Sequence, residues 1–161
     1  ASRIEVAETE VGDKGIKRLE QTRIKIDRFT GGAFESALFS EEPLFGNQDS
    51  RLTLELTLRL PDEGKSGERA EIGLLLLLLK DLWTGDLPIG GESAIGRGQL
   101  RGVEATIKYN GRCWKLNQTD SGKIAALEAK LDAQGNETSS EANRDELDSF
   151  VAALVKELRN G

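Results

Sequence analysis

Six consecutive leucines, Leu74–Leu79, constrain the fold of this chain more than any other feature. They lie within "ERAEIGLLLLLLKDLWTG", residues 68–85, which predicts a helix that is apolar on most of its circumference and ends near Gly85. Because such a helix has little polar surface to leave in water, we expect it to be buried on several sides, against a sheet and a further surface. The apolar run stops at Lys80, well short of the roughly 18 residues that span a bilayer, so no membrane partner is expected.

Alternating apolar and polar residues predict β-strands on both sides of this helix. The clearest is "RLTLELTLRL", residues 51–60, in which leucines line one face and Arg, Thr and Glu the other. We expect one face of this strand to meet a core. Shorter alternating segments predict further strands at residues 2–11, 22–26, 36–42, 102–109 and 112–116.

Glycine-containing turns join some of these strands into hairpins. Gly31 and Gly32 can adopt positive φ between residues 22–26 and 36–42, and Asn110-Gly111 is a strong hairpin turn. Antiparallel hairpins with few helices favour an α+β fold whose helices lie on one face of a sheet.

The C-terminal part is expected to be mainly helical. "GKIAALEAKLD", residues 122–132, predicts a short helix, and "AQGNETSSEA", residues 133–142, a solvated spacer. Asn143 and Glu146 have the spacing of a capping box that opens a final helix. An apolar stripe follows at helical period, so we expect this helix to dock on the sheet or on a neighbouring subunit. The stripe consists of Leu147, Phe150, Val151, Leu154 and Leu158.

The composition excludes several kinds of chemistry. The sequence has no histidine and one cysteine, Cys113, which leaves no Ser-His-Asp triad, no histidine-containing zinc site and no thiolate cage. We interpret Asp27 and Asp86 as turn or ion-pair residues. No catalytic residue, metal ligand or cofactor is therefore predicted in this chain. The lone cysteine and the polar first residues favour a cytoplasmic location.

Charge is distributed unevenly. The formal net charge of −6 argues against indiscriminate binding of nucleic acid. Between Lys14 and Arg28, however, six basic residues face two acidic ones, a local charge of +4. Between Gly96 and Tyr109 three basic residues face one acidic residue, a local charge of +2. Such patches, more than the total, attract polyanions.

The loop that follows the leucine helix, "DLPIGGESAIGRGQL", leaves two interpretations open. It is neither a P-loop nor a dinucleotide fingerprint, because it follows a helix and precedes a strand. It could be a tight helix-to-strand connection that needs positive φ. Alternatively, its bare backbone N–H groups, with Ser93 and Arg97 beside them, could hold the phosphates of a nucleic-acid strand.

Two segments in this order resemble one protein family. "IKIDRFTGGAFESALF", residues 24–39, followed by "LLLLLLKDLWTGDLPIGGESAIGRGQLRG", residues 74–102, is similar to the RAMP superfamily, which builds the crRNA-binding backbone of type III CRISPR effector complexes. The resemblance spans residues 1–109. It implies a ferredoxin-like, RRM-type antiparallel sheet with helices on one face, here without its first strand and helix. We therefore expect a RAMP/RRM-like domain at residues 1–110 and a C-terminal extension with a helical tail at residues 111–161.

The resemblance also implies where RNA binds. The glycine loop of the family contacts the guide-RNA backbone, which carries over to Gly90, Gly91, Ser93, Gly96, Arg97 and Gly98. The hairpin resembles the family's thumb, which wedges between bases, with Phe29 as the wedge and cations beside it. The RNA-binding residues expected there are Arg23, Lys25, Arg28, Phe29 and Thr30.

The leading hypothesis is a structural backbone subunit of a type III CRISPR ribonucleoprotein in antiviral defence, which binds crRNA, target RNA and other effector subunits. An alternative is a metal-dependent endoribonuclease that cuts target RNA, whose catalytic aspartate would precede Ala1 and whose cofactor would be a divalent metal. A second alternative is a protein-only assembly module that binds neighbours through the leucine helix and the C-terminal stripe.

Overall fold

The computed structural model describes residues 3–12, 14–60, 67–118, 124–131, 137–142 and 144–160. These residues fall into two compact units, Ala1–Arg59 and Leu60–Gly161. The division expected at residues 110 and 111 stays a prediction. Asn143, expected to cap the final helix, lies outside the described residues.

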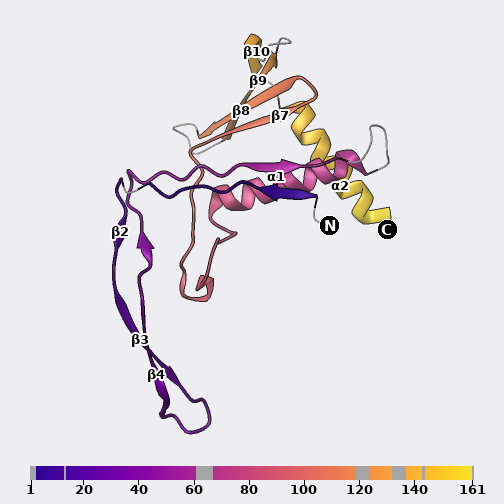
Figure 1. The fold of residues 1–161 in the computed structure, drawn as a ribbon. Helices are drawn as coiled ribbons and strands as arrows, with labels where there is room; N and C mark the ends of the chain where they lie inside the picture. Colours follow the sequence, from indigo (N-terminus) through magenta and orange to yellow (C-terminus); the bar gives the residue numbers. More distant parts are fainter. Residues whose placement is uncertain are drawn as a thin grey trace. The chain divides into compact units, whose positions relative to one another are not determined.

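The first unit is a long, interrupted hairpin made of three antiparallel strand pairs (Figure 1). The pairs are nested, because the strands of each pair enclose those of the next pair in the sequence. From the outermost to the innermost, they are β1 (Ile4–Val6) with β6 (Leu56–Leu58), β2 (Lys17–Arg18) with β5 (Leu44–Phe45), and β3 (Gln21–Ile26) with β4 (Ala33–Glu41). The hairpin expected around Gly31 and Gly32 is therefore confirmed.

The predicted length of the strand at residues 51–60 is wrong. Within the described part of the chain, strand structure covers Leu56–Leu58 alone, because the partner strand β1 is equally short. Two flanking hydrogen bonds, Ala7 N–H to Glu55 C=O and Arg59 N–H to Arg3 C=O, complete the ladder. The leucines do alternate with exposed polar side chains, and each of them is half-buried.

The second unit is an antiparallel sheet with helices. Its sheet has the order β10-β9-β8-β7. In chain order its elements are α1 (Glu68–Thr84), the 3₁₀ turn η1 (Ser93–Ile95), β7 (Glu104–Tyr109), β8 (Arg112–Gln118), β9 (Ile124–Leu131), β10 (Glu137–Ala142) and α2 (Asp145–Asn160).

Two expectations for the C-terminal part are wrong. Residues 122–132 were expected to form a helix and 133–142 a spacer, but β9 pairs with β8 and β10 with β9. The segment is rich in Ala, Leu, Lys and Glu, which favour helices. Pairing with β8 overrides this local preference, because it buries Ala126 beside the core.

The helices cover one face of this sheet, as expected for the α+β class. Ile107 and Trp114 are paired across β7 and β8, and Trp114 is fully buried. The Tyr109 ring meets the buried Phe150 ring of α2 edge-on, with 5.6 Å between centroids. On the opposite face, the alternating residues of β7, Glu104, Thr106 and Lys108, are exposed, whereas Cys113 of β8 is buried. The arrangement is consistent with the ferredoxin-like class that the resemblance implied.

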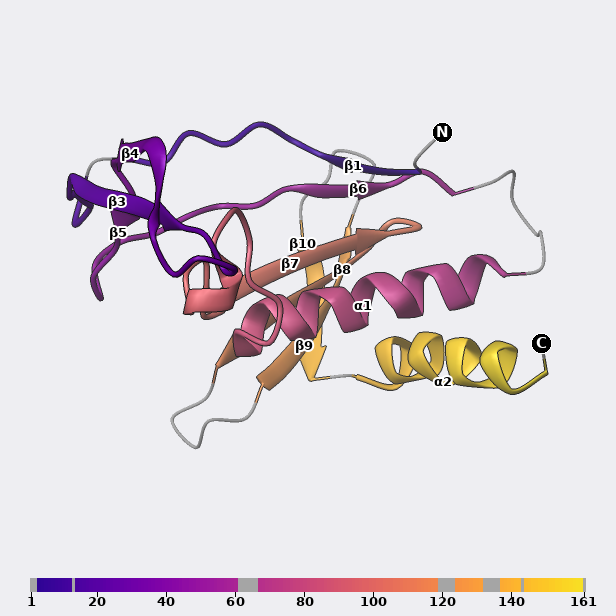
Figure 2. The ribbon, with the colours of Figure 1, turned by 90° about the horizontal axis from the view of Figure 1, so that it is seen from below.

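α2 packs inside this unit, against α1 and, through Phe150 and Tyr109, against the sheet, which was one of the two docking sites expected for it. Figure 2 shows α2 beside the first half of α1. Phe150 and Leu154 face Gly73, where the absence of a side chain lets the helices approach closely. Leu158, the last residue of the expected stripe, is 73% exposed.

No helix in the described ranges combines the length and the hydrophobicity needed to cross a membrane.

Candidate nucleic-acid interface

The glycine-rich loop is closed by backbone hydrogen bonds at its base. α1 ends at Gly85, whose φ of 81° lies in the left-handed region. Ile89 N–H donates to the Gly98 carbonyl at 2.9 Å, and Gly102 N–H donates to the Trp83 carbonyl at 3.0 Å. Because Trp83 is buried, the loop starts and ends on a rigid support.

Two of its glycines are required by packing. A Cβ on Gly98 would overlap the carbonyl oxygen of Ile89, and Gly98 also has a φ of 75°. A Cβ on Gly102 would overlap the Trp83 ring. At these positions the loop is the tight connection that one interpretation of the sequence anticipated.

Gly91 is different, because the fold itself does not require glycine there. Its φ is not positive, and no heavy atom lies within 4 Å of the position its Cβ would take. Gly90 and Gly96 face equally open space, but their φ values of 82° and 80° favour glycine. In the described part of the chain, the N–H groups of Gly90, Gly91 and Ser93 donate no hydrogen bond. These exposed donors can therefore donate hydrogen bonds to a bound anion.

The charge of Arg97 is already paired within the loop. Its guanidinium forms an ion pair with Glu92, and both side chains are largely buried. Glu92 itself has a φ of 62°, and its carbonyl accepts the Ile95 N–H at 3.0 Å. The ion pair holds the η1 turn in place. Arg97 thus lies in the predicted loop, where its side chain stabilises the loop itself. Sequence analysis missed Glu92, because a spacing of five residues in a loop carries no periodic signal.

The tip of the β3–β4 hairpin is a turn built around Asp27. Its carboxylate accepts the Phe29 N–H at 2.8 Å, and its carbonyl accepts the Gly31 N–H at 2.9 Å. Asp27 N–H donates to the Gly32 carbonyl at 2.9 Å. Asp27 is thus a turn residue, as interpreted from the sequence. The turn leaves the Phe29 side chain 99% exposed at the tip.

The expected cations of the hairpin have different surroundings. Arg23 forms an ion pair with Glu41 at 3.1 Å, so its charge is partly compensated. Lys25 lies over the Phe34 ring, 5.1 Å from the centroid, a contact that sequence analysis missed. Arg28 is exposed and makes no ion pair with any described residue.

The remaining expected residue of the tip, Thr30, has an exposed side chain whose hydroxyl accepts the Gly32 N–H at 3.3 Å. The structure thus places Arg28, Phe29 and Thr30 together at the hairpin tip and the glycine-loop residues together after α1. Among the described residues, no group of three or more His, Cys, Asp or Glu side chains could hold a metal ion.

Comparison with known families gives one match. The sequence model of the RAMP superfamily matches residues 8–101, which include the complete β3–β4 hairpin and the complete glycine-rich loop. Searches of curated proteins and of solved structures found no match.

Proposed function

Because the chain belongs to the RAMP superfamily, whose members bind RNA in CRISPR complexes, we propose that it is a crRNA-binding backbone subunit of a type III CRISPR ribonucleoprotein that recognises target RNA. The observation that carries the proposal is the extent of the family match, which covers the hairpin and the loop together. The geometry of each element supports a separate part of the proposed binding.

The loop fits the RNA backbone. Exposed N–H donors at Gly90, Gly91 and Ser93 suit phosphate oxygens, and the open space at Gly91 lets a phosphate approach the main chain. Main-chain donors do not discriminate between bases. The loop would therefore bind any guide sequence, as a backbone subunit must.

The tip of the β3–β4 hairpin is suited to contact the bases of the RNA. Phe29 presents a whole aromatic ring to solvent, and Arg28 beside it is an exposed cation. An exposed ring on a turn fixed by Asp27 can stack on a base or enter between two bases, while Arg28 neutralises a phosphate.

The loop assignment is tested with one variant and one matched control. Gly91→Asp places a carboxylate where we propose that a phosphate lies. Gly12→Asp makes the same change at an exposed glycine that also lacks positive φ and has no heavy atom within 4 Å of its Cβ position. Neither substitution strains the fold, so thermal unfolding midpoints should match that of the unmodified chain.

We expect Gly91→Asp to weaken binding of single-stranded RNA by the full chain at least about tenfold, and Gly12→Asp to change it less than about twofold, measured by fluorescence anisotropy at fixed salt. Two RNAs of unrelated sequence should bind with similar affinity, which falls as salt rises. Equal affinities of the two variants would remove the loop from the interface. A strong preference for one RNA sequence would contradict backbone recognition.

A further inference from the structure

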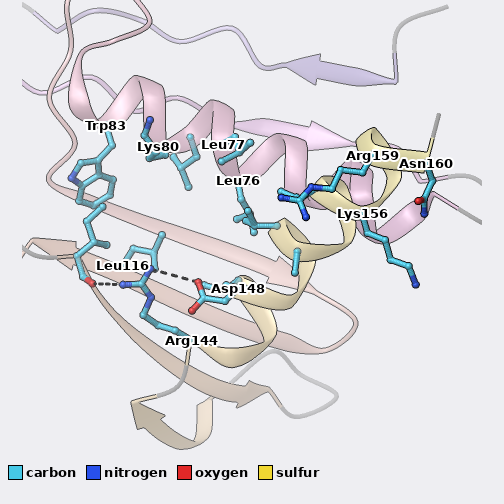
Figure 3. A pocket seen from close by; sticks show the side chains of 16 residues that line it. Leu76, Leu77, Lys80, Trp83, Leu116, Arg144, Asp148, Lys156, Arg159 and Asn160 are labelled. Carbon is cyan, nitrogen blue, oxygen red and sulfur yellow. Dashed lines mark hydrogen bonds and ion pairs between the residues drawn. The ribbon is translucent and has the colours of Figure 1, made fainter.

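The second unit contains a groove whose lining includes none of the proposed RNA-binding residues. It has a volume of about 720 Å³ and lies between the second half of α1, the length of α2 and the ends of β8 and β9 (Figure 3). Its lining on α2 runs from Leu147 to Asn160, which corresponds to about 20 Å of helix. The groove is therefore long for its volume, a shape that suits a rod.

The groove is lined mainly by aliphatic side chains. Leucines of α1, Val151 and Val155 of α2, and Leu116 of β8 all line it. Figure 3 shows Leu76 and Leu77 on α1 and Leu116 on the sheet. Val155 is 40% exposed, and the leucines of α1 that line the groove are half-buried. No described residue covers these side chains completely. An exposed apolar surface of this kind is typical of a site that binds another molecule.

The charged residues at the groove are predominantly basic. Arg144 lies 3.6 Å from Asp148, and Lys80 pairs with Asp81 at 2.6 Å. Lys156 and Arg159 near the end of α2 are exposed and form no ion pair with any described residue. Figure 3 shows both at the same end of the groove. Two uncompensated cations therefore border an apolar surface.

We propose that this groove binds an amphipathic helix of a partner protein, with aliphatic side chains on one face and carboxylates along its edge. The aliphatic face would cover the groove leucines, and the carboxylates would pair with Lys156 and Arg159. Helices commonly bind in this way, with apolar anchors at positions i, i+3, i+4 and i+7 laid into a groove. The charge of the rim selects an acidic partner over a basic one.

RNA fits this groove less well than a helix does. Single-stranded RNA is bound by aromatic platforms along a basic track. Here Trp83 supplies the aromatic part of the lining and is itself buried, and the other apolar groups are aliphatic. The proposal is independent of RNA binding through the loop and hairpin.

The probe is a synthetic helical peptide of about five turns with leucines at i, i+3, i+4 and i+7 and glutamates beside them. A second peptide replaces each glutamate with lysine. Fluorescence anisotropy measures binding of each labelled peptide to the full chain. The double variant Lys156→Glu and Arg159→Glu reverses the rim charge, and Val155→Asp adds a carboxylate to the groove. Lys108→Glu, at an exposed site on the opposite face of the sheet, is the matched control.

We expect the acidic peptide to bind and the basic peptide to bind at least about tenfold more weakly. The rim double variant and Val155→Asp should each weaken binding of the acidic peptide about tenfold, while Lys108→Glu leaves it unchanged. The proposal is overturned if the acidic peptide does not bind or if both groove variants bind it like the unmodified chain. Displacement of the peptide by single-stranded RNA, with RNA binding lost in the rim variant, would assign the groove to RNA instead.

Discussion

Gly73 of α1 faces the backbone carbonyl of Phe150 in α2 so closely that a Cβ on Gly73 would overlap that oxygen and lie 3.1 Å from the Leu154 Cβ. The two helices therefore meet main chain to main chain at this point. The contact holds α2 against α1 and fixes one wall of the groove.

Replacing Gly73 with alanine is therefore expected to destabilise the chain. Alanine favours the helix by about 1 kcal/mol, but the overlap with Phe150 forces the helices apart, and overpacking of this kind costs about 1–3 kcal/mol or more. We expect a net loss of about 1–2 kcal/mol in the free energy of unfolding, measured by urea denaturation. Gly12→Ala, where space is open, is the control. An unchanged midpoint for Gly73→Ala would show that the helices do not touch there.

The glycines of the loop should separate into two groups. Gly98→Ala forces a Cβ against the Ile89 carbonyl at a φ of 75°, which should cost about 1–3 kcal/mol and open the loop base. Hydrogen exchange at the Ile89 N–H, which bonds the Gly98 carbonyl, should then become faster. Gly91→Ala should leave exchange unchanged. Equal protection in both variants would contradict the packing assigned to Gly98.

Removing the Phe29 ring should affect RNA without affecting the fold. Because the side chain is almost fully exposed, Phe29→Ala should leave the unfolding midpoint unchanged. If the ring stacks on a base, the change removes about 1–3 kcal/mol, which lowers RNA affinity roughly five- to 150-fold. Phe29→Trp should retain binding. Loss of binding in both variants would point to a role other than stacking.

The pKa of Tyr109 gives a prediction for alkaline pH. Tyr109 donates its O–H to Glu68 at 2.6 Å, and this hydrogen bond raises the pKa of the phenol above its usual value of 10.0. The folded chain thus holds the proton more tightly than the unfolded chain does. The stabilisation is complete below pH 10 and is lost as the pH rises through the folded pKa.

The phenolate absorbance reports this group alone, since the sequence contains a single tyrosine. Its titration midpoint should lie above that of the chain unfolded in urea, and Glu68→Ala, which removes the acceptor, should bring the two midpoints closer together. Identical midpoints in the folded and unfolded chain would exclude the hydrogen bond.

Local sequence signals predicted the elements whose cause is local. The leucine helix ends at Gly85, and the Asn110-Gly111 turn joins β7 to β8, as their residues indicated. The errors arose where a distant partner decides the structure. Residues 124–131 favour a helix by composition but pair with β8, and residues 51–55 alternate like a strand but have no partner strand in the described ranges.

The candidate site shows the same division. The sequence located the loop and the hairpin, because glycine clusters and turn residues mark them directly. It did not distinguish Gly91, open to solvent, from Gly98, packed on Ile89, since that difference depends on how the loop folds back. It also did not show that Arg97 is paired with Glu92.

The nested pairing of the first unit determines the order in which it can fold. The β3–β4 turn closes within a few residues, whereas β1 and β6 come from opposite ends of the unit. Closing a long loop costs more chain entropy than closing a short one. We therefore expect the β3–β4 pair to form first, the β2–β5 pair next and the β1–β6 pair last. A substitution that weakens the Asp27 turn should then slow the folding of the whole unit. The turn that leaves Phe29 exposed would also be the part from which the unit nucleates.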